Sequence, residues 1–205
     1  MQARRPTVII MLKEPRPGRV KTRLARDIET IRAAAWFRRE SAALVRRLTC
    51  GGRWNVVLAV APDLALGSAA LPLGVARVPQ GQGDLGARMA RLLAASPRPV
   101  VLVGSDIPEL GAAHIARAFR RLGGSDMVFG PAEDGGFWLV GLGGVRSLPR
   151  DPFKGVRWSQ AATLSDTIAG LHTRRVAFAD RLSDVDTAAD LARNRAAVAT
   201  GGRSD

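Results

Sequence analysis

Asp106 is the first residue in the chain whose type and position suggest chemistry. It lies in Gly104-Ser105-Asp106-Ile107-Pro108, directly after the apolar run Val100–Gly104. That run is typical of a central strand buried on both faces. A carboxylate at such a strand end suits Mg²⁺, which binds one or two carboxylates together with phosphate oxygens and water. The alternative, a helix cap near Gly111, is weaker because Pro108 and Glu109 intervene.

A second acidic segment, Ser183-Asp184-Val185-Asp186-Thr187, lies near the end of the chain. The two acids alternate, so in an extended segment their side chains point the same way. One of them could complete a metal site with Asp106. The competing role, capping the last helix, fits Asp184 better than Asp186.

A basic loop, Lys13–Leu24, follows the first apolar run of the chain. Two prolines stiffen it, Gly18 allows a tight turn, and it carries five cationic side chains: Lys13, Arg16, Arg19, Lys21 and Arg23. Strand-to-helix loops that bind phosphate combine free backbone N–H groups with Lys or Arg. The spacing is not that of a Walker motif. The loop is therefore either a phosphate-binding loop or a solvated basic loop.

Two glycine-containing loops complete the set. In the segment 80–89, Gly81, Gly83 and Gly86 would let a ligand approach the backbone, and Asp84 could either accept from a ribose or base or cap the next helix. In the segment 130–138, Glu133 and Asp134 precede Gly135-Gly136 and the aromatic pair Phe137-Trp138. A hairpin turn alone explains Asp134-Gly135. The two aromatic side chains could wall a pocket or enter the core.

The elements that must position these loops alternate between strands and helices. The expected strands are Thr7–Leu12, Asn55–Ala61, Gly74–Val78, Val100–Gly104, Met127–Gly130, Gly136–Leu142 and Thr173–Phe178. The expected helices are Glu29–Leu48, Asp84–Ala95, Gly111–Leu122, Ser159–Gly170 with Ser159 as N-cap, and Thr187–Val198. This alternation predicts a single α/β domain over residues 1–198 with a mostly parallel sheet, followed by a flexible tail, 199–205. Ligands bind such sheets at the carboxyl ends of the strands, where the five loops lie.

Composition limits the function classes. The net charge is +13, but only three of the 31 basic residues are lysine, which indicates a coding bias toward arginine. The arginines are scattered and the chain has no Tyr, so we expect an anionic small substrate rather than a specific nucleic acid. No apolar run is long enough to span a membrane, and the N-terminus lacks the pattern of a signal peptide, which predicts a cytoplasmic protein. Cys50 is the only cysteine, which excludes an intrachain disulfide.

The five loops, in this order, resemble the nucleotide-diphospho-sugar transferase superfamily with the glycosyltransferase-A-like fold. More narrowly, the chain resembles the selenodomain-associated transferase 1 family. The resembling motifs are Lys13-x-Pro15-x-Pro17-Gly18-x-x-Lys21-Thr22-Arg23-Leu24, Gln80-Gly81-x-Gly83-Asp84-Leu85-Gly86-x-Arg88, Gly104-Ser105-Asp106-x-Pro108-x-Leu110, Gly130-Pro131-Ala132-Glu133-Asp134-Gly135-Gly136 and Asp184-Val185-Asp186-Thr187. The first loop and the Gly135-Gly136 turn also resemble those of 2-phospholactate guanylyltransferases.

The resemblance implies a three-layer α/β/α fold, a nucleotide over the first loop, and Mg²⁺ or Mn²⁺ on Asp106 joined by Asp186. The expected nucleotide-binding residues are Lys13, Gly18, Lys21, Arg23, Gly83, Asp84 and Gly86. The expected catalytic residues are Lys21, Asp106 and Asp134, and the expected acceptor pocket is Gly135, Gly136, Phe137 and Trp138. Phe137 stands where the family more often has Tyr, so it has no polar role.

The expected function is a metal-dependent transferase that uses an NTP or a nucleotide-sugar and a small-molecule acceptor. Ser105-Asp106 offers one carboxylate where the glycosyltransferase Asp-x-Asp motif has two, so nucleotidyl and glycosyl transfer both stay open. The alternative class is a non-catalytic nucleotide-binding or regulatory module, which would still bind a nucleotide after Asp106→Ala. Neither the oligomeric state nor the identity of the base, sugar and acceptor follows from the sequence.

Overall fold

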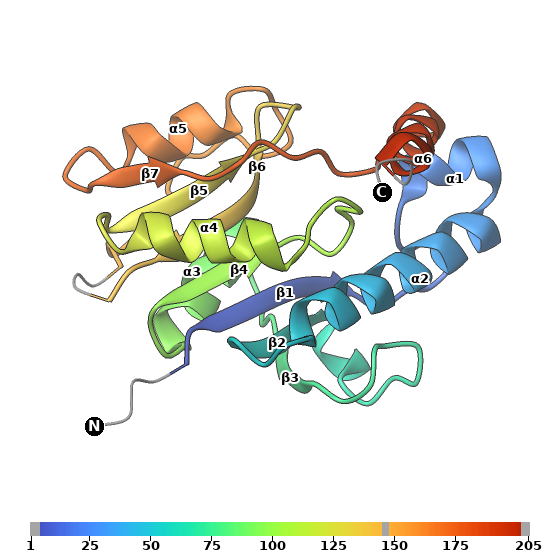
Figure 1. The fold of residues 1–205 in the computed structure, drawn as a ribbon, viewed down its shortest axis with the longest axis horizontal. Coiled ribbons are helices and arrows are strands. Elements are labelled where there is room, and N and C mark those ends of the chain that lie inside the picture. The colour runs from blue at the N-terminus through green and yellow to red at the C-terminus, as the bar shows by residue number, and fades with distance from the viewer. Residues whose placement is uncertain (1–4, 145–147, 202–205) are drawn as a thin grey trace.

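The computed structural model describes residues 5–144 and 148–201, which form a seven-stranded mixed sheet with helices on both faces (Figure 1). The strand order is β3-β2-β1-β4-β6-β5-β7, and β6 runs antiparallel to both of its neighbours while the other pairs are parallel. The strands are β1 (Thr7–Lys13), β2 (Asn55–Ala61), β3 (Ala76–Pro79), β4 (Val100–Val103), β5 (Met127–Pro131), β6 (Phe137–Leu142) and β7 (Val176–Phe178).

The helices form two layers. They are α1 (Thr22–Ile28), α2 (Thr30–Thr49), α3 (Leu85–Ala95), α4 (Ala112–Leu122), α5 (Thr163–Ala169) and α6 (Ala188–Gly201), with a short 3₁₀ turn, η1 (Asp63–Ala65). One core contains side chains of α1, α2, α4 and α6, and the other contains side chains of α3 with Leu164 of α5 packed against it. Figure 1 shows α2 and α4 in front of the sheet and α3 behind it.

Strand β1 shows why the central strands are continuously apolar. Its residues Val8, Ile9 and Ile10 are at most 1% exposed, because successive side chains enter opposite cores. Val8 and Ile10 pack on the α2 side and Ile9 on the α3 side. The predicted three-layer α/β/α fold with a mostly parallel sheet is confirmed.

Two local predictions were wrong. Helix α1 was expected to be loop, but it begins at Thr22, directly after Lys21, whose backbone is left-handed (φ 47°). Ser159 does not cap α5: it lies in a turn with φ 58°, and the helix begins at Thr163. The Thr163 hydroxyl is hydrogen-bonded to the carbonyl oxygens of Arg157 and Gln160. These bonds stabilise the turn before the helix, so the helix begins only at Thr163.

The last helix of the chain is longer than expected. Helix α6 runs to Gly201 rather than ending at Val198, so it includes the first three residues of the expected tail. The rest of that tail, 202–205, and residues 1–4 of the expected domain lie outside the described residues. Within the described part of the chain, no helix combines the length and the apolar character needed to cross a bilayer.

Candidate functional site

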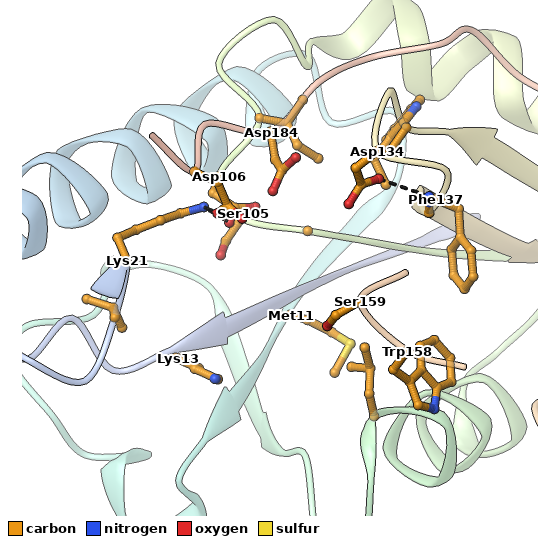
Figure 2. A pocket seen from close by; sticks show the side chains of 18 of the residues that line it. Met11, Lys13, Lys21, Ser105, Asp106, Asp134, Phe137, Trp158, Ser159 and Asp184 are labelled. Atoms are coloured by element: carbon orange, nitrogen blue, oxygen red, sulfur yellow. Dashed lines mark hydrogen bonds and ion pairs between the residues drawn. The ribbon is translucent and has the colours of Figure 1, made fainter. Parts of the chain in front are cut away.

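A cleft of about 540 Å³ opens at the carboxyl ends of β1 and β4, lined by residues from all five loops (Figure 2). This volume is in the range of small-molecule sites. Six of the lining residues are charged side chains at or beside the expected metal and phosphate positions: Lys13, Lys21, Arg23, Asp106, Asp184 and Asp186. The loops that the sequence singled out therefore converge on one cavity.

The carboxylates of Asp106, Asp184 and Asp186, called the acidic cluster below, lie together in this cleft. One oxygen of each lies within 4.8 Å of the others. The backbone N–H of Val185 donates to the Asp106 carbonyl oxygen (3.2 Å), which aligns the segment after β7 with the end of β4. Val185 is buried in the core, so its two acidic neighbours face the cleft, as their alternation predicts.

Lys21 is placed on the acidic cluster. Its Nζ lies 2.5 Å from Asp106 Oδ2 and 2.7 Å from Asp186 Oδ1, and its side chain is only 5% exposed (Figure 2). Burial alone would lower the pKa of its ammonium, but the two carboxylates outweigh burial and raise the pKa above the ordinary lysine value. Arg23, which is largely exposed, adds a 3.0 Å ion pair to Asp186 Oδ2. Lys21 therefore holds two of the three carboxylates in position.

The sequence predicts either a metal-binding or a capping role for Asp184, and the expected metal pair is Asp106 with Asp186. Burial, followed by repulsion from the Asp106 carboxylate, raises the pKa of Asp184 to about 6. Three carboxylates and one buried ammonium carry a formal charge of −2 when all are ionised. An all-oxygen donor set with that charge fits Mg²⁺ or Mn²⁺.

The basic and glycine-rich loops contribute unequally. Lys13, Arg19 and Arg88 line the cleft, and Arg88 Nη1 donates to Gln80 Oε1 (2.9 Å). Gln80 is buried, and its Nε2 donates to the Ala59 carbonyl oxygen (2.8 Å), so the pair is fixed to the end of β2. The expected site did not include Arg19, Gln80 and Arg88, although all three belong to the basic and glycine-containing loop segments.

Four expected nucleotide-binding residues, Gly18, Gly83, Asp84 and Gly86, are not among the described residues that line the cleft. Asp84 Oδ1 instead accepts from the Ala87 N–H (2.8 Å) and caps α3. A Cβ on Gly86 would lie 2.8 Å from Phe153 Cβ and 2.9 Å from Trp158 Cζ2, so this glycine permits close packing. Gly18 and Gly83 have positive φ and serve turns.

The loop between β5 and β6 supplies the opposite wall. Asp134, Gly136, Phe137 and Trp138 line the cleft, and Asp134 Oδ1 accepts from the Gly136 N–H at 2.9 Å (Figure 2). Trp138 is mostly buried, and its Nε1 donates to the Asp180 carbonyl oxygen (2.9 Å). Gly135 does not line the described cleft; a Cβ there would lie 2.2 Å from the Ala161 carbonyl oxygen. Gly135 is therefore a packing residue.

Two further lining residues, Trp158 and Ser159, come from the segment before α5. The sequence carried no signal for Trp158, because its segment has no motif and lies outside the five loops. The sequence predicts Ser159 as a helix cap and gives it no nucleophile-elbow context.

A family model described as "Uncharacterized protein conserved in bacteria (DUF2064)" matches residues 44–160, which is more than half of the chain. The chain belongs to this family. No curated protein matches this DUF2064 member.

Solved structures similar to this DUF2064 protein include one from Desulfovibrio desulfuricans G20 that is provisionally described as a nucleotide-diphospho-sugar transferase. It is 28% identical, with a TM-score of 0.80, and the match covers 92% of this chain and 85% of that one. CMP:2-keto-3-deoxy-manno-octonic acid synthetase complexed with CTP is 11% identical (TM-score 0.53, coverage 96% and 99%). Rv0371c of Mycobacterium tuberculosis H37Rv in complex with manganese is 18% identical (TM-score 0.52, coverage 94% and 98%).

These likenesses confirm the resemblance to nucleotide-diphospho-sugar transferases and the fold that it implied. The two more distant structures support only the fold of this DUF2064 protein.

Proposed function

We propose that this protein is a divalent-metal- and nucleotide-dependent transferase acting in the cleft between the acidic cluster and Asp134. The observation that carries the proposal is the meeting of Asp106, Asp184 and Asp186 with Lys21 and Arg23 at the carboxyl ends of the strands. Like charges brought this close repel each other, and a divalent cation with a phosphate-bearing ligand would balance them.

The acidic cluster would hold Mg²⁺ or Mn²⁺. When bound, the ion would supply positive charge against the phosphates of the nucleotide. A protein of the same fold that was solved with manganese supports this choice of metal.

The cationic side chains around the cluster would bind the phosphates. The Lys21 ammonium has three N–H donors, of which two point to Asp106 and Asp186, so the third can reach a phosphate oxygen. Arg23 and Lys13, both exposed, also line the cleft. Arg88 of α3, whose guanidinium is held by the Gln80 side chain, would offer its remaining N–H groups to the ribose. Domain 1–198 would form the whole of this site.

Nucleotidyl transfer is the form that we favour. An acceptor phosphate oxygen attacks the α-phosphorus of an NTP, a new P–O bond forms, and pyrophosphate leaves with the electron pair of the broken P–O bond. No base is required, because the attacking oxygen is already ionised. The segment around Asp106 favours this form, since it offers one carboxylate where the glycosyltransferase Asp-x-Asp motif has two.

Glycosyl transfer is the second candidate, and Asp134 favours it. An acceptor hydroxyl would attack the anomeric carbon of a nucleotide-sugar while the nucleoside diphosphate leaves with the electron pair of the broken C–O bond. The proton of the hydroxyl would pass to a carboxylate, and Asp134 is exposed in the cleft.

Thermal unfolding with Mn²⁺ plus each NTP, and with Mn²⁺ plus common nucleotide-sugars, tests the proposal. We expect at least one nucleotide class to raise the melting temperature only when metal is present. Asp106→Asn should weaken Mn²⁺ binding by about a hundredfold or more, because the loss of a direct ligand should at least equal the roughly 10–100-fold loss seen when an outer-shell partner is changed. The matched control, exposed Asp151→Asn, should bind as the native protein does. Absence of any nucleotide shift with metal would refute both forms.

A further inference from the structure

The cleft has two chemically different ends. The charged end holds the acidic cluster with Lys21. The apolar end is lined by Met11 of β1, Leu85 and Met89 of α3, Phe137 of β6 and Trp158 of the segment before α5. Leu85 and Met89 are four residues apart and therefore share one face of α3. Figure 2 shows Met11 and Trp158 together below the charged side chains.

Packing holds the apolar end in place. The Phe137 ring centroid lies 5.2 Å from that of Phe129 and 6.3 Å from that of Trp158, and Phe153 lies 6.0 Å from Trp158. Gly86 leaves room for the Trp158 ring against the first turn of α3. These rings form a preformed wall.

The wall is only partly covered. Leu85 is 36% exposed, and Met11, Phe137 and Trp158 are half-buried, whereas Met89 beneath them is buried. Apolar surface left in water is unfavourable, and an apolar ligand seated here would remove it from water. The wall is continuous with the charged end within one cavity, so a single small ligand can touch both.

Hydrogen-bonding capacity at this end is low. Among the described lining residues, the polar side chains near α3 and α5 are Gln80, Arg88, Ser159 and Thr163. Arg88 already donates to Gln80 Oε1 (2.9 Å) and to the Asp84 carbonyl oxygen (3.2 Å), and the Thr163 hydroxyl is already hydrogen-bonded to the carbonyl oxygens of Arg157 and Gln160. A sugar would bury several hydroxyl groups here without partners, at a cost in free energy. A nucleobase has the same difficulty with its ring nitrogens and exocyclic groups.

We propose that the apolar end binds the acceptor, and that the acceptor is an amphiphilic molecule. Its apolar body lies against Met11, Leu85 and Phe137, and its phosphate or hydroxyl group points toward Lys21. This inference rests on the proposed function, because it assigns the second substrate of that transfer reaction.

Phenyl phosphate and glycerol 3-phosphate are suitable probes, since both are phosphate monoesters and they differ in the polarity of the body. Titration calorimetry in the presence of Mn²⁺ gives both dissociation constants. We expect phenyl phosphate to bind roughly tenfold or more tightly, from burial of its ring. Equal binding, or tighter binding of glycerol 3-phosphate, overturns the inference.

Variants at the apolar end test whether this end causes the preference for phenyl phosphate. Leu85→Gln and Met11→Gln should each reduce the preference for phenyl phosphate at least about threefold, by replacing apolar contact with an amide. Leu73→Gln is the matched control, because Leu73 is 81% exposed and lies outside the cleft. The native preference should survive in this control. Preference that also survives in both cleft variants overturns the inference.

Nucleotide affinity, measured with Mn²⁺ on the same variants, separates this inference from the proposed function. Unchanged nucleotide affinity together with lost phenyl phosphate preference supports the assignment to the acceptor. A parallel loss of nucleotide affinity shows that the wall holds the nucleobase and overturns that assignment. If the native protein binds no nucleotide but prefers phenyl phosphate, the proposed function fails while the apolar binding site stands.

Discussion

The acidic cluster and the glycine-rich loop at 80–86 both carry motif-like residues at strand ends, yet the structure uses them in opposite ways. In the loop, polar groups satisfy one another: Asp84 caps α3, and the Gly81 N–H donates to Asp63 Oδ1 (3.0 Å). In the acidic cluster, three carboxylates lie together with one buried ammonium. Unbalanced charge of that kind costs stability and indicates a site for an external ligand, whereas mutual satisfaction indicates a structural role.

Removal of Lys21 tests the charge balance of the cluster and should have the largest effect. Lys21→Met leaves two carboxylates without their buried cation, and we expect a loss of about 3 kcal/mol in the free energy of unfolding at pH 7. A saturating concentration of Mn²⁺ should restore roughly 2–3 kcal/mol, because the ion replaces the missing charge. Urea denaturation with and without MnCl₂ measures both quantities.

Lys154→Met provides the matched control, since Lys154 is an exposed lysine outside the cleft. Its stability should change by less than about 0.5 kcal/mol, as for most surface substitutions. A Lys21→Met protein that is as stable as the native one, or that gains nothing from Mn²⁺ beyond the native gain, would contradict the charge-balance account.

These two regions also show how far sequence reasoning reaches. The alternating acids at 184 and 186 and the strand-end position of Asp106 follow from periodicity, which is local, so their convergence could be predicted. The roles of Gly86 and Gly135 depend on Trp158, Phe153 and Ala161, which approach from a distant loop. A glycine that admits a ligand and a glycine that admits a neighbouring side chain look the same in sequence. Only tertiary packing separates them.

Lys21 shows the same limit for a charged residue. The composition of the basic loop predicted that a cation of this loop lies near phosphate. Its ion pairs to Asp106 and Asp186 join positions 85 and 165 residues away, and no local pattern encodes them. The left-handed backbone of Lys21, which starts α1 and turns the side chain inward, was likewise invisible.

Gly86→Ala tests the glycine-rich loop by packing. The new Cβ would meet Phe153 and Trp158 at less than 3 Å, so we expect a destabilisation of about 2 kcal/mol from overpacking. Mn²⁺ affinity, measured by titration calorimetry, should stay within about twofold of the native value, because Gly86 does not line the cleft. Gly67→Ala, where the Cβ would have open space, is the control for the loss of a glycine. Native-like stability of Gly86→Ala would show that Phe153 and Trp158 shift easily to make room for the new Cβ.

Asp84→Ala should have the smallest effect, and it decides between the two roles that the sequence left open for this residue. Loss of the N-cap bond to Ala87 should cost about 1 kcal/mol in the free energy of unfolding. Asp84→Asn keeps a capping oxygen and should recover most of that loss. Nucleotide affinity in the presence of Mn²⁺ should be unchanged in both variants, because the carboxylate is committed to the helix. A drop in nucleotide affinity for Asp84→Ala with native stability would reverse the assignment and make Asp84 a ligand-binding residue, which would place the glycine-rich loop beside the acidic cluster as a site of chemistry.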